Sequence, residues 1–200
     1  TWLSPSNARM CVAMRSRNHR SWLITTTQPG NDSSPASSAR SVSAPPPITI
    51  PDYQPVTPEM LANPADGDWP MYRRTYNGWG YSPLDEINVE NVAGLRPAWS
   101  IATGRTEGHE APPIVVNGVM FAATAGNQVL AIDPVAGDIL WRYVRPLPED
   151  MLGSHPTNRG VAVLGDKVYF VSRDSILVAL DAKSGAEVWS ATMQDYHQGY

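Results

Sequence analysis

Residues 131–141 are Ala131-Ile-Asp133-Pro-Val-Ala-Gly137-Asp-Ile-Leu-Trp141, and residues 179–189 repeat the pattern as Ala179-Leu-Asp181-Ala-Lys-Ser-Gly185-Ala-Glu-Val-Trp189. Alanine, aspartate, glycine and tryptophan recur at a constant offset of 48 residues. The apolar pairs that precede these segments follow the same offset. The two segments therefore belong to two copies of one structural unit, and repeats of this length are typical of stacked or circular architectures.

Each copy contains four short apolar runs separated by turn residues. In the first copy the runs are 114–116, 119–124, 129–132 and 139–144, and Asn117-Gly118 between the first two is a strong hairpin signal. Four antiparallel strands in a repeat of this length are typical of a β-propeller blade. We predict an all-β protein, a partial β-propeller with four-stranded blades over residues 112–141 and 160–189. A plain amphipathic β-meander is the alternative, and it does not explain so many matches at one offset.

The repeated tryptophans are expected to join neighbouring blades. The aspartate should cap the turn after the third strand, and the glycine should supply a positive φ. Trp141 and Trp189 then lie on the outer strands, and we expect both to be buried, each near the glycine of its own blade and facing the adjacent blade. A weaker match that ends in Trp99 predicts a lone outer strand, which a circular propeller pairs with its last blade. Two blades and one strand cannot close a ring, so we expect the N-terminal part of a larger propeller.

Residues 1–50 differ in composition from the rest of the chain. They contain five Arg, ten Ser, six Pro and one acidic residue, Asp32. A segment so poor in apolar periodicity buries too little surface to offset the entropy of ordering it, so residues 1–50 are predicted to be disordered. Its basic residues and the short run from Trp22 make an unconvincing export signal. Residues 51–200 are predicted to form the propeller part.

Composition excludes several classes of protein. The net charge of −4 gives no reason to expect a nucleic-acid partner. No run approaches the roughly 18 apolar residues of a membrane span, so the chain is not expected to cross a bilayer. The lone Cys11 excludes an intrachain disulfide framework and a cysteine zinc site. The histidines lack metal-ligand spacing, and Glu149 and Asp150 are expected in a solvated turn.

The stretch Asp68-Trp-Pro-Met-Tyr-Arg-Arg-Thr-Tyr-Asn-Gly-Trp-Gly-Tyr-Ser-Pro-Leu-Asp-Glu-Ile-Asn88 resembles the N-terminal signature of quinoprotein alcohol dehydrogenases. The resemblance continues through Gly108-His-Glu110-Ala-Pro-Pro, both tryptophan motifs and Asn158-Arg159-Gly160. It covers about three quarters of the chain. It implies an eight-bladed propeller that holds pyrroloquinoline quinone and a Ca²⁺ or lanthanide ion on its axis.

Two charged residues are candidates for binding the cofactor. A shift of 48 residues from Glu110 leads to Asn158, next to Arg159, so both charges lie just before the first strand of successive blades. That strand is innermost in a propeller, and its start lies at the mouth of the central channel. The resemblance implies that Arg159 pairs with a quinone carboxylate and that Glu110 hydrogen-bonds the cofactor's rim. Plain surface charges are the alternative for both.

The resemblance also implies the reaction, the oxidation of an alcohol to an aldehyde or ketone by hydride transfer to the quinone. It implies a periplasmic enzyme with cytochrome c or another electron acceptor as partner. The family's catalytic Asp and its cation ligands are expected beyond residue 200, so we assign no catalytic and no metal-binding residue. The 200 residues alone are expected to be inactive.

One departure from the family affects the substrate. Many members carry two adjacent cysteines, joined in a disulfide ring against the quinone, where this chain has Gly153 and Ser154. Methanol and ethanol, the usual substrates, are therefore not assigned. The competing hypothesis is a cofactor-free propeller that serves as a scaffold or binding module. Such a propeller has no need of Glu110 and Arg159 at the channel mouth.

Overall fold

The computed structural model describes residues 9–14, 23–27, 50–151 and 157–198, and nearly all regular structure in them is β. One four-stranded antiparallel sheet has the order β4-β5-β6-β7 and a second has the order β8-β9-β10-β11. These strands are β4 (Ile114–Val116), β5 (Val119–Thr124), β6 (Gln128–Ile132), β7 (Ile139–Val144), β8 (Ala162–Leu164), β9 (Lys167–Val171), β10 (Ile176–Asp181) and β11 (Glu187–Thr192). The prediction of two four-stranded blades is confirmed.

A third sheet contains three strands in the order β2-β1-β3. They are β1 (Arg9–Met14), β2 (Leu23–Thr27) and β3 (Arg96–Ala102). The outer strand predicted around Trp99 is therefore present as β3, but its neighbour is β1 rather than a last blade. Within residues 1–50, which composition predicts to be disordered, β1 and β2 have backbone partners that composition does not reveal, and the disorder of the segment stays a prediction. The remainder of that segment lies outside the described residues.

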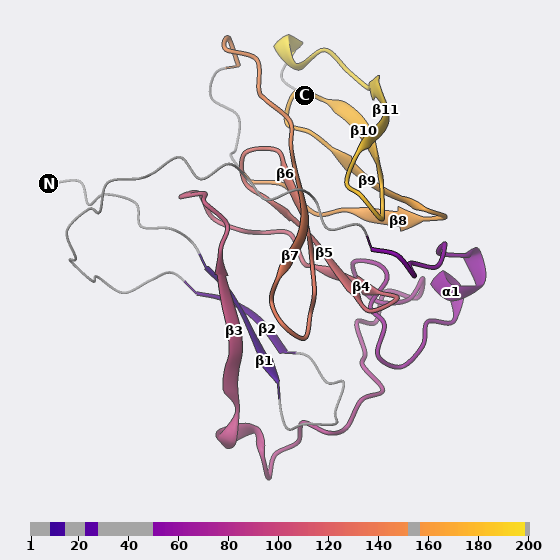
Figure 1. Cartoon of the computed structure of the whole chain (residues 1–200), viewed down its shortest axis with the longest axis vertical. Coiled ribbons are helices and arrows are strands. Elements are labelled where there is room, and N and C mark those ends of the chain that lie inside the picture. Colours follow the sequence, from indigo (N-terminus) through magenta and orange to yellow (C-terminus); the bar gives the residue numbers. More distant parts are fainter. Residues whose placement is uncertain (1–8, 15–22, 28–49, 152–156, 199–200) are drawn as a thin grey trace, which may run out of the picture.

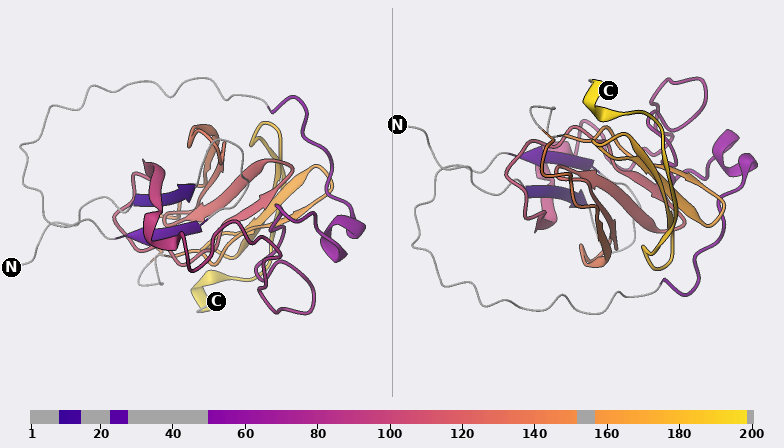
Figure 2. Two further views of the ribbon diagram at one scale, coloured as in Figure 1. Left: turned by 90° about the horizontal axis from the view of Figure 1, so that it is seen from below. Right: turned by 90° about the horizontal axis from the view of Figure 1, so that it is seen from above.

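The three sheets lie side by side, with the blade β4–β7 in the middle (Figure 1 and Figure 2). One of its faces packs on the blade β8–β11 through a core that includes Phe121 and Trp141 on one side and Phe170 and Leu180 on the other. Its other face packs on Trp69 and on side chains of β3. Because both faces are covered, every residue of β5 and β6 is buried. Every residue of β11, in the outer blade, is exposed.

The segment before β3 runs along the ends of the blades. Val56 forms an antiparallel bridge with Gly165, and Trp69 forms one with Val115 of β4. This segment contains two short helices, α1 (Pro58–Ala62), which is capped by the Thr57 hydroxyl, and η1 (Val92–Gly94). A third short helix, η2 (Tyr196–Gln198), follows β11. None of the helices in the described ranges has the length and apolarity needed to cross a membrane.

The tryptophans join the blades in a different way from the one predicted. The indole of Trp141 lies on Gly185 of the following blade and donates to the Ala182 carbonyl at 2.9 Å. Trp99 makes the equivalent contact with Gly137 and donates to the Pro134 carbonyl at 3.0 Å. The prediction that each tryptophan lies near its own blade's glycine is wrong, because a tryptophan on the outer strand reaches the turn of the next sheet.

Trp189 is also more exposed than predicted. It is 40% exposed, whereas Trp141 is 2% exposed. The repeated Asp-to-Gly turns of the two blades, at Gly137 and Gly185, are already covered by Trp99 and Trp141. Trp189 therefore lies on the outer blade without a glycine turn against it in the described part of the chain.

Candidate functional site

Glu110 and Arg159 lie before the first strands of the two blades, as the repeat predicts. The structure brings them into contact with each other, with Arg159 Nε 3.3 Å from a Glu110 carboxylate oxygen. The Arg159 side chain is 85% exposed and that of Glu110 38% exposed. The ion pair involves Nε, so the terminal guanidinium nitrogens of Arg159 remain available to a ligand. Cofactor binding by these two residues stays a prediction.

The backbone around Arg159 is fixed by its neighbours. The Asn158 side chain donates to the Val171 carbonyl at 2.9 Å and accepts from the Gly160 amide at 2.9 Å. Gly160 has φ 128°, and a Cβ there would lie 3.9 Å from the Pro112 carbonyl oxygen. The tripeptide from Asn158 to Gly160 is thus tied to β9 and lies against the segment that carries Glu110. A glycine is favoured at this φ because side chains rarely adopt it.

The segment before Glu110 is held by a buried polar cluster around Thr103. The Thr103 hydroxyl lies 3.2 Å from His109 Nε2, and its carbonyl accepts from Gln128 at 3.0 Å and from Arg142 at 3.3 Å. Burial lowers the pKa of His109, although the charge of Glu107 opposes this shift. A neutral His109 next to Thr103 is therefore the form that the fold favours. The spacing of the histidines along the chain does not reveal this contact of His109 with Thr103.

An open groove of about 690 Å³ lies beside Arg159. Its lining includes Arg159 and Arg173 together with the other residues of 157–162 and Tyr169. A guanidinium matches a carboxylate because two parallel N–H groups meet its two oxygens. An exposed arginine that is held in place by its backbone and by Glu110 fits one carboxylate of a quinone acid. The residues present therefore fit this part of the expected cofactor.

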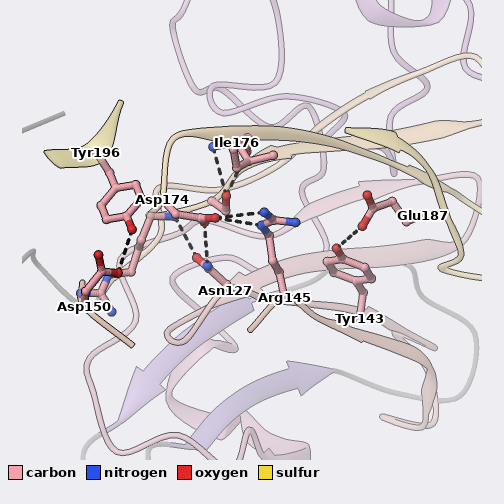
Figure 3. A network of polar contacts seen from close by, with 10 residues as sticks. Asn127, Tyr143, Arg145, Asp150, Asp174, Ile176, Glu187 and Tyr196 are labelled. Atoms are coloured by element: carbon pink, nitrogen blue, oxygen red, sulfur yellow. Dashed lines mark hydrogen bonds and ion pairs between the residues drawn. The ribbon is translucent and has the colours of Figure 1, made fainter. Parts of the chain in front are cut away.

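A second polar network joins the two blades (Figure 3). Asp174, whose side chain is 4% exposed, accepts from Asn127 at 3.3 Å and pairs with Arg145 at 3.1 Å. Asn127 also accepts from the Arg173 amide at 2.9 Å. Burial alone would raise the pKa of Asp174, but hydrogen bonds from Ser172 and Arg145 outweigh it and lower the pKa. No spacing rule links residues so far apart in sequence, so this network was not predicted.

A third, exposed cluster links the loop after β7 to η2. Asp150 lies 3.1 Å from His197 Nε2 and accepts from the Tyr196 hydroxyl at 2.8 Å, while Asp195 lies 2.7 Å from His197 Nδ1. Asp150 is exposed, as predicted, but it is paired rather than only solvated. No group of three metal-binding side chains suited to an ion occurs in the described ranges. Gly153 and Ser154 lie outside the described residues.

Most of the aromatic residues before β3 lie at the surface rather than pack together. Trp69 packs against the central blade, but Tyr72, Trp79 and Tyr81 are 66%, 78% and 70% exposed. Tyr72 and Trp69 line a groove of about 350 Å³ with Leu84 and Pro112. The family-like stretch 68–88 is thus mostly a surface segment in this structure.

Comparisons with known proteins give a consistent result. Residues 69–188, more than half of the chain, match the family model for the β-propeller domain of PQQ glucose/ethanol/alcohol dehydrogenases. The chain is 40% identical over 144 residues to the dehydrogenase subunit of a quinone alcohol dehydrogenase from Gluconacetobacter polyoxogenes, covering 70% of this chain and 20% of the relative. It is also 40% identical over 150 residues to a 1-butanol dehydrogenase (quinone) from Thauera butanivorans, covering 72% of this chain and 24% of the relative.

Solved structures agree with the sequence relatives. A europium-containing methanol dehydrogenase matches with a TM-score of 0.64 and 33% identity, over 68% of this chain and 25% of that one. The quinohemoprotein alcohol dehydrogenase from Comamonas testosteroni matches with a TM-score of 0.62 and 38% identity, over 68% and 21%. The chain spans about a quarter or less of the length of these relatives. Its repeat, its blades and these matches show that it belongs to the PQQ-dependent glucose/ethanol/alcohol dehydrogenase family, in whose β-propeller domain residues 69–188 lie.

Proposed function

We propose that this chain is the N-terminal part of a quinone-dependent dehydrogenase that oxidises an alcohol to an aldehyde or ketone. Arg159 and Glu110 would contribute to binding pyrroloquinoline quinone. The observation that carries the proposal is their meeting at 3.3 Å, at matching positions before the first strands of adjacent blades. Family membership supports the reaction class.

Each residue has a defined part in this proposal. Arg159 would hold a quinone carboxylate with its terminal nitrogens, while Glu110 keeps the guanidinium oriented through Nε and can accept from the cofactor's rim. Asn158 and Gly160 would keep the backbone of Arg159 in place. The bound quinone would accept the hydride of the alcohol. The Ca²⁺ or lanthanide ligands and the catalytic base are not among the residues that we assign.

The wider setting of the enzyme follows from the family in the same way. We expect a small alcohol as substrate, cytochrome c or another electron acceptor, and a periplasmic location. The names of the relatives include alcohol, 1-butanol and methanol dehydrogenases, so the alcohol class is supported and the individual alcohol is left open.

A chimaeric enzyme tests the proposal. Residues 69–188 of this chain would replace the matching segment of the 1-butanol dehydrogenase from Thauera butanivorans, and quinone binding to the apo-chimaera would be measured by titration calorimetry. We expect binding and butanol oxidation. Arg159→Ala should weaken quinone binding by roughly several-fold to a few hundred-fold. The variant lacks one partner of a charged pair, and solvent in an open site reduces the cost of that removal. Arg96→Ala, an exposed arginine on β3, is the matched control and should leave binding unchanged.

The outcomes separate the two classes of function. A chimaera that unfolds cooperatively on heating but binds no quinone would overturn the proposal and favour a cofactor-free scaffold. Equal quinone affinity in the Arg159→Ala and Arg96→Ala chimaeras would remove Arg159 from the site.

A further inference from the structure

The edge of β3 is occupied by a segment from the start of the chain. β1 pairs antiparallel with β3, and β2 pairs antiparallel with the far side of β1 (Figure 1). The order β2-β1-β3 has the same arrangement as the second, third and outer strands of a blade, β5-β6-β7 and β9-β10-β11. β1 therefore lies where a third strand belongs.

The register of the pairing matches the blades residue by residue. In each outer strand the residue before the tryptophan has no partner and forms a bulge, while the tryptophan itself faces a residue of the third strand. The bulged residues are Ala98, Leu140 and Val188, and the partners of the tryptophans are Val12, Ala131 and Ala179. A bulge re-aims the next side chain, and here that side chain is the one that docks on a glycine turn. The same bulge in three sheets places β1 in the register of a true third strand.

The connection shows that this hairpin is not a third copy of the repeat. In the blades the second strand precedes the third along the chain, whereas here β1 precedes β2. At the register position of Asp133 and Asp181, β1 has Met14, so the residue that caps the docking turn is missing. The segment thus supplies strand pairing without the rest of the motif.

β3 needs such a partner for a physical reason. An outer strand without a neighbour exposes a row of unpaired N–H and C=O groups, which invites pairing with other chains. β3 also carries Trp99, whose docking on Gly137 covers one face of the central blade. A neighbouring strand in the correct register holds the bulge that presents this tryptophan.

From these observations we infer that the hairpin strands β1 and β2, residues 9–14 and 23–27, are strand donors that complete the sheet of β3. They fill the positions of a second and third strand. Any other third strand that pairs with β3, from this protein or another copy, must displace the hairpin. The hairpin and such a strand are mutually exclusive partners of β3. This role goes beyond the proposed dehydrogenase function and does not depend on it.

An engineered disulfide tests the register. Cys11 is the single cysteine of the chain and faces Ser100 across the β1–β3 pair. Directly opposite residues of an antiparallel pair are separated by about 4.5–5.5 Å between Cα atoms, within the range of a disulfide. Mild oxidation of Ser100→Cys should consume both thiols within a monomer. Ile101→Cys, which is opposite Met10 and so on the other face relative to Cys11, is the matched control and should keep its thiols. Equal oxidation of the two variants would overturn the inference.

Hydrogen exchange tests the effect on β3. A proline in a central strand removes a ladder hydrogen bond. Val12→Pro should therefore speed amide exchange over 96–102 by about tenfold or more relative to Val12→Ala, while exchange in β6 and β10 stays unchanged. Unchanged exchange over 96–102 would show that β3 does not depend on the hairpin. Faster exchange in all three sheets alike would show general destabilisation and would also count against the inference.

Discussion

Trp141 of one blade covers Gly185 of the next, so closely that a Cβ on the glycine would lie 2.6 Å from the indole ring. The indole N–H also reaches the Ala182 carbonyl at 2.9 Å. One residue thus joins two sheets through a flat apolar contact and a hydrogen bond. Trp99 and Gly137 repeat the arrangement on the other side of the central blade.

Trp141→Ala should strongly destabilise the protein. The side chain is 2% exposed and packs with Phe121, with ring centroids 5.8 Å apart. Truncation of a buried aromatic costs about 3–5 kcal/mol. Trp189→Ala, at a tryptophan that is 40% exposed, is the control and should lose less than half as much. Urea denaturation of both variants checks this, and equal losses would contradict the docking role.

Gly185→Ala should destabilise more than a glycine replacement at a turn with free space. Both Gly185, with φ +72°, and Gly118, with φ +74°, have a positive φ that strains alanine. A Cβ at Gly118 would meet nothing within 4 Å, whereas one at Gly185 would collide with Trp141. Gly118→Ala should therefore show only the backbone strain, about 1–2 kcal/mol. The extra loss in Gly185→Ala, measured by the same denaturation, reports the docking contact, and similar losses would argue against it.

Much of the fold could be predicted because the turn residues are local signals. Asn117-Gly118 and the Asp-to-Gly turns delimit the strands, so the expected runs 114–116, 119–124 and 139–144 coincide with β4, β5 and β7. The glycine that each tryptophan contacts could not be predicted. A repeat gives the spacing of residues along the chain, but it does not show which copy supplies the glycine turn on which the indole packs. β1 and β2 escaped prediction because β1 pairs with the distant β3 and β2 joins that sheet only through β1.

The positions of Glu110 and Arg159 before the first strands of the blades were predictable, but the contacts around them were not. The offset of 48 leads from Glu110 to Asn158, next to Arg159, and the structure brings Glu110 and Arg159 to 3.3 Å. The links that hold them, such as Thr103 to His109, depend on burial that one sequence does not display. Asp174 and Arg145 are 29 residues apart and meet only because two blades pack together.

Asp174→Ala should destabilise the contact between the blades. The carboxylate is buried and holds Arg145 at 3.1 Å and Asn127 at 3.3 Å, so its removal takes a charged hydrogen-bond partner from both side chains. Hydrogen bonds to charged groups contribute about 1.5–3 kcal/mol, and a loss in that range is expected. Lys167→Ala, which removes an exposed ion pair with Asp166, is the control and should change stability much less. A double-mutant cycle with Arg145→Ala that shows no coupling would exclude the pair as the cause.

The 200-residue chain alone should bind no quinone and oxidise no alcohol. It provides the starts of two first strands at the mouth of the expected channel, so a bound quinone would have one side in water. A site that lacks the groups of the other blades is not preorganised for binding. Titration calorimetry with pyrroloquinoline quinone and excess Ca²⁺ measures the binding, and dye reduction with primary alcohols measures the activity. Binding in the micromolar range, at about −8 kcal/mol, or any alcohol-dependent dye reduction would contradict this prediction.

The pKa values of His109 and His197 should lie on opposite sides of the usual histidine value of 6.5. Burial lowers the pKa of His109, whereas hydrogen bonds with Asp195 and Asp150 raise that of His197. The contribution of His109 to stability is therefore present above pH 6.5 and is lost as the pH falls through its lowered pKa. The contribution of His197 is present below pH 6.5 and is lost as the pH rises through its raised pKa.

Imidazole NMR titrations check these directions, with His109→Asn and His197→Asn used to assign the signals. Asp195→Asn should bring the pKa of His197 back towards 6.5, because it removes the largest cause of the upward shift, and it should leave His109 unchanged. A common pKa for the two histidines in the unmodified chain would contradict both environments. A His109 signal that moves with Asp195→Asn would show that the clusters are coupled, contrary to their separate hydrogen-bond partners.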